Sequence, residues 1–462
     1  MMPSDDVRRV HEAGLRILER TGMVFKHAKA LAVFGAHGFE VDGQRVLMSA
    51  EQVLHALAPA PAEFVLQGRS PDRDLRFGGD GLVVATGAGP PLLVEAGASR
   101  PCTDDDLQTS IRLAHQLANV DMIGFPLEPQ DVPPADRYTL CVRRALTLSD
   151  KPLEYALSTA EHLQVALDTS EILFGSRWEE RPRLFGVVNT VSPLQLEADA
   201  CLAVVELAAR RQPLCVTPCA MGGTTGPVTL AGLVALQHAE ILGGLVLAQL
   251  VSPGCPVVYG GFSSVASMVS GDPLFGVPEY WLAMTTTVQL ARHLSLPSRA
   301  GAAVTDAHLP DLQAGIESAA AMTAVVEAGV NFVLHGAGIL SALNAMSFEK
   351  LVADDEMVGM LRTLRAGVPV DDESLAVDVI GRVGPGGNFL LEEHTAAHCR
   401  DGYRPSFFNR RRHDAWRQHG GRDVVAEASL RAAALLASYG APELEESTLR
   451  RLHEYAPGSG PA

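Results

Sequence analysis

The segment TDAHLPD gathers side chains that could move protons or face a positive charge. Asp306, His308 and Asp311 lie close together, and Gln313 and Glu317 follow with the spacing of one helical turn. Carboxylates and imidazoles are the usual proton-transfer groups of active sites. Asp306 and His308 are therefore candidate catalytic residues and Gln313 is a candidate substrate contact, whereas Asp311 could simply cap the helix that follows.

A glycine-rich loop, MGGTTGP at 221–227, leads into a long apolar run and could bind an anion. Gly222 and Gly223 would allow close approach of the backbone, and the N-terminus of the following helix would present unpaired N–H groups to a carboxylate or phosphate. Alternatively, the glycines only form a turn and Thr225 helps to cap the helix. Gly222, Gly223 and Thr225 are candidate substrate contacts, although a phosphate-loop lysine is missing.

A repeated pattern of strand, loop and helix must position these residues. Short β-rich runs occur at 82–87, 120–126, 153–158, 184–189, 213–218, 256–261, 298–305 and 330–335, and helical runs follow each. Eight such alternations predict parallel strands with crossover helices, closed into a (β/α)8 TIM barrel. We expect a mostly helical extension over 1–80, the catalytic barrel over 81–368, and a loop and helical extension over 369–462.

The carboxyl ends of the barrel strands give further candidates, because the loops there form the active site in this architecture. His335 is a candidate catalytic residue, and Asn189, Tyr259, Gly260 and Phe262 are candidate substrate contacts. Schiff-base chemistry is disfavoured because it needs a lysine at this end of a strand. The lysines near the barrel pattern instead precede the third strand or lie in a late helix.

Two further pairs have the spacing of metal ligands. Cys215 and Cys219 are four residues apart and could bind zinc, but no nearby histidine completes a ligand set, so core cysteines are favoured. His394 and His398 would share one face of a helix. They lie outside the barrel pattern and are better interpreted as packing or surface residues. No metal site is therefore predicted.

The run Thr229–Val251 is long and apolar enough to cross a bilayer, yet it carries Gln237, His238 and Glu240 at its centre. Burying the Glu240 carboxylate in hydrocarbon would cost about 2 to 4 kcal/mol, and no aromatic or basic belt flanks the run. We therefore expect an outer barrel helix after the fifth strand, deep in a large protein.

Composition narrows the class of protein. The formal net charge of -17 disfavours contact with nucleic acid or anionic lipid, which both need clustered Lys and Arg. The N-terminal residues lack the apolar core of a signal peptide, so a cytoplasmic location is expected. Seven cysteines at irregular spacing indicate reduced thiols. The terminal extensions are expected to cap the barrel or to join copies of the chain in a homo-oligomer.

Five blocks of sequence resemble the trimethylamine methyltransferase family, specifically its branch without pyrrolysine, which includes glycine betaine methyltransferases. They occur in the expected order at 98–121, 224–242, 259–281, 297–319 and 389–416. The resemblance implies a (β/α)8 barrel that moves a methyl group from a methylated amine to the Co(I) corrinoid of a separate protein. Pyrrolysine belongs near the seventh strand in trimethylamine enzymes. His308 stands there among standard residues, which implies a quaternary amine such as glycine betaine, proline betaine or carnitine.

A quaternary ammonium suits such a site because its leaving group is already a neutral amine, so positioning does most of the work. The pocket should then supply aromatic faces for the cation. Tyr259, Phe262, Phe275 and Tyr280 are candidates, with Glu279 beside them in the same block. The carboxylate of a betaine would bind the glycine-rich loop or the histidine that ends the last strand.

No permanently bound cofactor is expected. The segment DAHLPD has Asp311 where the corrinoid-binding signature DxHxxG has glycine, so a cognate small corrinoid protein must bring the cofactor. The substrate would be a small quaternary or tertiary amine. Two alternatives remain open at this point: a zinc-assisted thiol or alcohol methyltransferase that uses Cys215 and Cys219, and a catalytically silent protein that binds a methylated amine or a partner.

Overall fold

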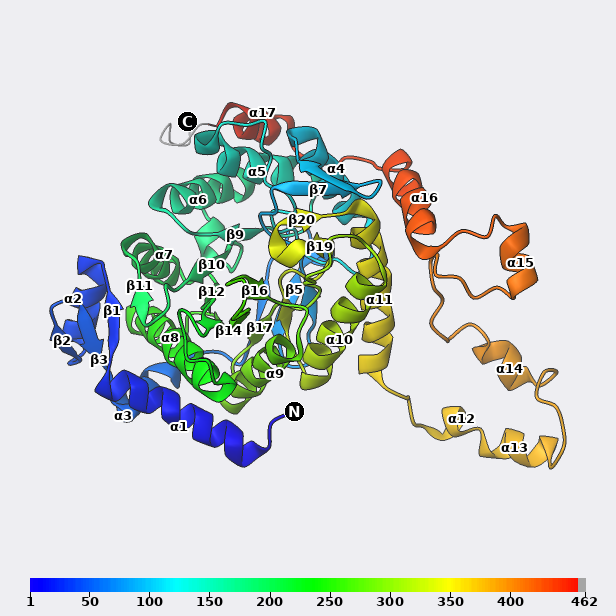
Figure 1. Cartoon of the computed structure of the whole chain (residues 1–462), viewed down its shortest axis with the longest axis horizontal. Helices are drawn as coiled ribbons and strands as arrows, with labels where there is room; N and C mark the ends of the chain where they lie inside the picture. The colour runs from blue at the N-terminus through cyan, green and yellow to red at the C-terminus, as the bar shows by residue number, and fades with distance from the viewer. Residues whose placement is uncertain (456–462) are drawn as a thin grey trace.

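The computed structural model describes residues 1–455 and has a parallel sheet at its centre (Figure 1). Seven strands pair in the order β6, β18, β17, β14, β12, β10, β9, and every neighbouring pair is parallel. In that order they are Val83–Val84, Phe332–Val333, Ser298–Ala300, Val257–Gly260, Leu214–Thr217, Phe185–Asn189 and Glu154–Ala156. These strands fall within seven of the eight predicted runs.

The second predicted strand, 120–126, is the one missing from this sheet and is reduced to two isolated parallel bridges. Met122 pairs with Ala85 and Ile123 pairs with Leu153. The Asp121 carboxylate accepts a hydrogen bond from the Val84 backbone N–H at 2.8 Å, so a side chain occupies a donor that a strand partner would use. The structure therefore shows a seven-stranded parallel sheet in place of the eight regular strands expected from the sequence.

Helices connect the strands and cover the outside of the sheet (Figure 1). Parallel strands need such crossovers because a tight turn cannot join them. The covering helices are α4 (Asp104–Gln116), α5 (Pro134–Leu148), α6 (Ala160–Phe174), α7 (Ala198–Ala209), α8 (Leu230–Val251), α9 (Pro278–His293), α10 (Leu312–Ala328) and α11 (Phe348–Ala366).

A hairpin from the N-terminal region fills the amino end of the sheet. Its strands are β4 (Glu63–Leu66) and β5 (Leu75–Gly78), which pair antiparallel. The Phe77 ring lies 5.0 Å from Phe185 and 5.6 Å from Phe332, both in the sheet. Because buried aromatic rings close this end, open space is left toward the carboxyl ends of the strands.

Helix α8 is the apolar helix expected after the fifth predicted strand. Within residues 1–455 it is the one helix long and apolar enough to span a membrane, and 83% of its most apolar window is buried. Three N-terminal helices pack on it, α1 (Ser4–Arg20), α2 (Ala28–Ala36) and α3 (Ala50–Leu57). It is a core helix, because other parts of the chain cover the face that an outer barrel helix would turn to solvent.

The polar residues of α8 all have partners. Glu240 accepts hydrogen bonds from the Thr190 and Ser192 hydroxyls and from the Leu194 N–H. His238 is hydrogen-bonded to His11 and to the Tyr259 hydroxyl. Gln237 contacts Thr287 and the Ser263 backbone. The residues that argue against a membrane span therefore join α8 to the sheet and to the N-terminal helix.

Two small sheets are built from loops beyond the carboxyl ends of the strands. One contains β13 (Met221–Gly222), β15 (Ser264–Ala266) and β16 (Pro273–Leu274). The other contains β7 (Leu92–Glu95), β8 (Ala98–Pro101), β19 (Ile339–Leu340) and β20 (Ala345–Met346). These loops stiffen the rim around the open end.

The terminal regions pack differently from one another. The first 80 residues, expected to be mostly helical, also form β1 (Met23–Phe25), β2 (Glu40–Asp42) and β3 (Arg45–Leu47), with β11 (Gln195–Leu196) added in parallel to β1. Near the C-terminus, α16 (Val424–Ala437) packs on α11, and α17 (Glu446–Glu454) packs on α6.

Between α11 and α16, the C-terminal arm (residues 367–423) extends away from the body of the protein (Figure 1). It contains α12 (Asp372–Leu375), α13 (Val377–Val383), α14 (Glu393–His398) and α15 (His413–Gln418). His394 and His398 lie on α14, where His398 bonds Asp401 at 2.7 Å and Glu373 at 3.3 Å. These carboxylates raise the pKa of His398, Asp401 most strongly.

Candidate active site

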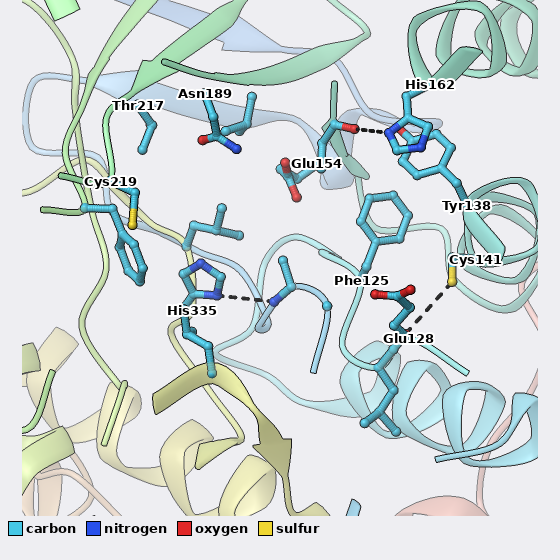
Figure 2. A pocket seen from close by; sticks show the side chains of 18 of the residues that line it. Phe125, Glu128, Tyr138, Cys141, Glu154, His162, Asn189, Thr217, Cys219 and His335 are labelled. Atoms are coloured by element: carbon cyan, nitrogen blue, oxygen red, sulfur yellow. Dashed lines mark hydrogen bonds between the residues drawn. The ribbon is translucent and has the colours of Figure 1, made fainter. Parts of the chain in front are cut away.

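A cavity of about 510 Å³ opens at the carboxyl ends of the strands (Figure 2). One part of its wall comes from strands and the residues that follow them, and the other comes from α5, α6 and the segment before α5. The lining residues include Ala88, Phe125, Glu128, Arg137, Tyr138, Cys141, Glu154, His162, Asn189, Thr217, Cys219, Phe262, Arg299, Leu334 and His335. The location is the one that the barrel architecture predicts.

Three of the predicted catalytic and substrate-contact residues line this cavity: Asn189, Phe262 and His335. His335 has a left-handed backbone with φ of +63°. Its Nδ1 accepts a hydrogen bond from the Ala88 N–H at 3.2 Å, which assigns the ring proton to Nε2. Burial lowers the pKa of His335 well below its usual value, with Arg299 adding to the effect. A neutral imidazole in fixed orientation therefore faces the cavity (Figure 2).

The predicted aromatic residues separate into different positions. Phe262 lines the cavity, while Phe275 and Tyr280 are buried behind it, with ring centroids 5.1 and 5.8 Å from that of Phe262. Tyr259 is on the opposite face of β14 and bonds His238 at 2.6 Å. Side chains alternate along a strand, so Tyr259 and Phe262, an odd number of positions apart, point to different sides.

Gly260 does not line the cavity. Its lack of a side chain lets the neighbouring strand pack closely against it. A Cβ there would lie 2.2 Å from the Thr217 Oγ1 and 2.6 Å from the Cys215 Sγ. Any side chain would therefore displace neighbouring strands. This position needs glycine because the interior of the sheet is closely packed around it.

The cluster after β17 holds loops together outside the cavity lining. Asp306 accepts hydrogen bonds from the backbone N–H of Phe275 at 3.0 Å and of Gly276 at 2.9 Å. His308 is exposed and bonds the Ser341 hydroxyl at 2.9 Å. Asp311 caps α10 through the Ala314 N–H at 3.1 Å, which confirms the capping alternative. Asp306 thereby holds in place the residues that support Phe262.

Two other predicted contacts lie on the surface. Gln313 is exposed on α10 and donates to Glu317 at 2.8 Å. Glu279 is exposed in the first turn of α9. Neither is among the residues that line the cavity.

The glycine-rich loop forms a turn beside the cavity. Gly223 has φ of +93°, and the Thr225 hydroxyl accepts from the Met221 N–H at 2.9 Å. Helix α8 begins later, with Thr229 as its N-cap. Thr225 therefore stabilises the turn and does not cap the helix. Gly222, Gly223 and Thr225 are not among the lining residues.

Sequence reasoning missed two buried charged residues in the floor of the cavity. Glu154 lies in β9, and neither carboxylate oxygen has a hydrogen-bond partner in the part of the chain that the structure describes. Burial raises its pKa to about 7, against the lowering effect of Arg299. Alternation along β9 could have identified Glu154, since it shares a strand face with Ala156, another lining residue.

Arg299 of β17 is the second missed residue. One of its terminal nitrogens donates to the Gly261 carbonyl at 2.9 Å, and its Nε has no partner. The guanidinium carbon lies 4.8 Å from the centroid of the Phe262 ring. Burial lowers the pKa of Arg299. Glu154 and Arg299 interact electrostatically, but within residues 1–455 neither Glu154 oxygen is hydrogen-bonded to Arg299.

Cys215 and Cys219 have different surroundings. Cys219 opens into the cavity, and the surrounding protein raises its pKa to about 11. Cys215 is fully buried, 3.3 Å from the Thr217 hydroxyl, with its pKa likewise raised to about 11. Within residues 1–455, no three His, Cys, Asp or Glu side chains gather as metal ligands. The arrangement thus favours protonated thiols, which are poor zinc ligands.

The far wall comes from a region that the sequence did not mark. Tyr138 of α5 stacks on His162 of α6, with ring centroids 3.7 Å apart. Glu128 pairs with Arg137 at 3.2 Å, and Phe125 adds another aromatic side chain to the lining (Figure 2). The cavity therefore combines aromatic surface, a neutral histidine and two unpaired charges.

Comparison with known proteins finds sequence matches along nearly the whole chain. A family model described as trimethylamine methyltransferase (MTTB) matches residues 1–457. A glycine betaine methyltransferase of Desulfitobacterium hafniense is 36% identical over 460 residues, covering 98% of this chain and 96% of the relative. An L-carnitine:corrinoid methyltransferase of Eubacterium limosum is 32% identical, covering 88% of this chain and 86% of the relative.

The fold is also that of a solved structure. The Methanosarcina barkeri monomethylamine methyltransferase (MtmB) aligns with a TM-score of 0.56 and 12% identity, covering 96% of this chain and 89% of the other. That likeness concerns the fold. The match along nearly the whole sequence goes further, and it shows that this chain is a methyltransferase that belongs to the trimethylamine methyltransferase family.

Proposed function

We propose that the protein transfers a methyl group from a small quaternary amine, such as glycine betaine, to the Co(I) corrinoid of a separate small protein. The observation that carries this proposal is a cavity with aromatic walls and the unpaired carboxylate of Glu154. Aromatic faces and a carboxylate are the groups that attract a quaternary ammonium. The names of the glycine betaine and carnitine relatives support the same substrate class.

The reaction is a displacement at carbon. An electron pair of Co(I) forms a bond to the methyl carbon, the carbon–nitrogen bond breaks, and its electron pair stays on nitrogen as a neutral tertiary amine. The other product is the methyl-Co(III) form of the corrinoid. No proton moves, and no covalent adduct of the substrate is needed. The cavity lining contains no lysine that could form one.

Positioning is then the main contribution of this chain. The Phe262 ring, backed by Phe275 and Tyr280, gives a rigid face for the ammonium group. The neutral imidazole of His335 adds no repelling charge. The buried phenylalanines at the amino end of the sheet make the rim the route by which a partner protein reaches the methyl group.

The proposal also covers the predicted domain bounds, two predicted catalytic residues and the C-terminal arm. Residues 81–368 form the catalytic unit, and the bridges at Met122 and Ile123 complete a closed barrel. Asp306 positions the loop behind the aromatic face, and His308 lies on the rim where the corrinoid protein docks. The C-terminal arm joins copies of the chain in a homo-oligomer.

The test is anaerobic. The protein is mixed with cob(I)alamin and, separately, glycine betaine, proline betaine, carnitine, choline and trimethylamine, and the visible spectrum is followed for methylcob(III)alamin. Methylation by a quaternary amine is expected. If the folded protein binds a methylated amine but none of these donors methylates cobalt, also with a corrinoid protein added, the proposal is wrong and a binding role replaces it. Stoichiometric zinc in the purified protein would support the zinc-assisted alternative.

A further inference from the structure

The floor of the cavity contains two opposite charges that do not pair with each other. Glu154 is completely buried and Arg299 is 2% exposed. Strands β14, β12 and β10 lie between their strands in the sheet order, so the two residues approach the interior from different sides. Figure 2 shows the Glu154 carboxylate directed into the cavity.

Each residue has unused bonding capacity. Among residues 1–455, neither Glu154 oxygen has a hydrogen-bond partner, and the Nε of Arg299 has none. The single side-chain hydrogen bond of Arg299 goes to a backbone carbonyl, which does not neutralise its charge. Buried charges without partners are rare because desolvation is costly, so such residues mark sites where a ligand supplies the partner.

We propose that Glu154 and Arg299 select a zwitterion, with Arg299 binding the carboxylate of the substrate and Glu154 facing its quaternary ammonium. The orientation of the substrate rests on the proposed function, because the transferred methyl group must face the rim. A betaine satisfies both charges at once. Choline and tetramethylammonium leave Arg299 without an anion, and a simple carboxylic acid leaves Glu154 without a cation.

The neighbours of Arg299 favour an anion at that position. Its guanidinium stacks against the Phe262 ring, and within residues 1–455 it interacts with the Glu154 carboxylate electrostatically but is not hydrogen-bonded to it. A guanidinium offers several N–H donors in one plane, which matches the two oxygens of a carboxylate.

Three ligands separate the two contributions by calorimetric titration without corrinoid. Glycine betaine carries both charges, choline lacks the carboxylate, and 3,3-dimethylbutanoate replaces the ammonium nitrogen by carbon. We expect glycine betaine to bind at least about tenfold more tightly than either analogue, since losing a partner of a buried charge is costly.

The variants should remove one preference each. Arg299→Met is expected to lower glycine betaine affinity to the level of choline and leave choline binding unchanged. Glu154→Gln is expected to lower glycine betaine affinity to the level of 3,3-dimethylbutanoate and leave binding of that acid unchanged or stronger. Arg299→Lys and Glu154→Asp keep the charges and should retain part of each preference, which covers the case in which a neutral variant fails to fold.

Matched controls come from an exposed ion pair on α17, Arg450 with Glu446. Arg450→Met and Glu446→Gln should change none of the affinities. Equal binding of glycine betaine and choline by the wild type would overturn the proposal, as would an equal loss of all three ligands in Arg299→Met. The expected binding pattern without methyl transfer would overturn the proposed function alone. Methyl transfer that does not depend on Arg299 would overturn this inference alone.

Discussion

Glu154 is a residue whose presence weakens the empty protein. Its pKa of about 7 in the folded chain exceeds the ordinary 4.5 because burial disfavours the charged form. The native state therefore holds a proton that the unfolded state has released between these pH values, and stability falls as pH rises through this window. A buried charge of this kind is retained where a ligand uses it.

The stability of Glu154→Gln should show this effect directly. Glutamine has no charge to bury, so the difference in unfolding free energy between variant and wild type should shift in favour of the variant by about 3 kcal/mol from pH 4.5 to pH 8. Urea unfolding at several pH values without ligand measures the shift. A difference that is constant across this range would contradict a raised pKa for Glu154.

Ligand affinity should depend on pH in the opposite sense. A quaternary ammonium prefers the charged carboxylate, so glycine betaine binding should strengthen by up to about tenfold per pH unit below pH 7 and level off above it. Arg299, Tyr138 and Cys215 interact electrostatically with Glu154, and Cys219, His162 and His335 line the same cavity. Burial raises the pKa of Tyr138, Cys215 and Cys219 and lowers the pKa of His162 and His335, so each of these shifts is away from pH 7. Titration calorimetry from pH 5.5 to pH 8.5 tests this, and Glu154→Gln should flatten the curve.

At the scale of elements, α8 and the loop after β10 depend on one carboxylate. Glu240 accepts three hydrogen bonds from that loop, which begins next to the cavity residue Asn189. The Glu240 network therefore connects the packing of a core helix to the wall of the site.

Removing the Glu240 carboxylate should destabilise the fold. Glu240→Ala leaves two hydroxyls and a backbone N–H without their acceptor and should cost about 2 to 4 kcal/mol. Glu240→Gln keeps an acceptor and should cost less. Denaturant unfolding gives both values, with the exposed Glu446→Ala as a control expected within about 0.5 kcal/mol of wild type. Equal, small losses for all three variants would show that the network contributes little.

At the scale of the whole molecule, the C-terminal arm has apolar residues that the rest of the described chain, residues 1–455, leaves exposed. Leu390 and Leu391 are 74% and 95% exposed, and Val368 is 85% exposed. The base of the arm is nevertheless fixed, because Glu356 of α11 accepts hydrogen bonds from the Tyr403 hydroxyl and the Ser406 N–H. A fixed arm with uncovered apolar tips is suited to contact another copy of the chain.

Changing the tip should therefore lower the oligomeric state. The double variant Leu390→Asp with Leu391→Asp places charges where apolar contact is proposed, and light scattering should report a smaller particle than for the wild type. The control Arg417→Ala, on α15 of the same arm, removes an exposed charged side chain and should leave the particle size unchanged. A wild-type protein that is monomeric at all concentrations would contradict the proposed homo-oligomer.

The sequence by itself determined much of the architecture. Apolar runs between loop residues located the seven strands of the central parallel sheet, and the polar residues of Thr229–Val251 argued correctly against a membrane span. These features depend on local hydrophobic patterns, which are readable along the chain. The five blocks of sequence also indicated the trimethylamine methyltransferase family, which the match over residues 1–457 confirms.

The tertiary structure alone decided which candidates meet. Strand alternation turns Tyr259 away from the cavity, while Phe262, three residues later, faces it. Glu154 and Arg299 are far apart in sequence and come together only through the order of the strands in the sheet. Side-chain direction depends on register and proximity depends on topology, and both are fixed by packing among distant segments. Local pattern locates the strands, but only the packed sheet assembles the site.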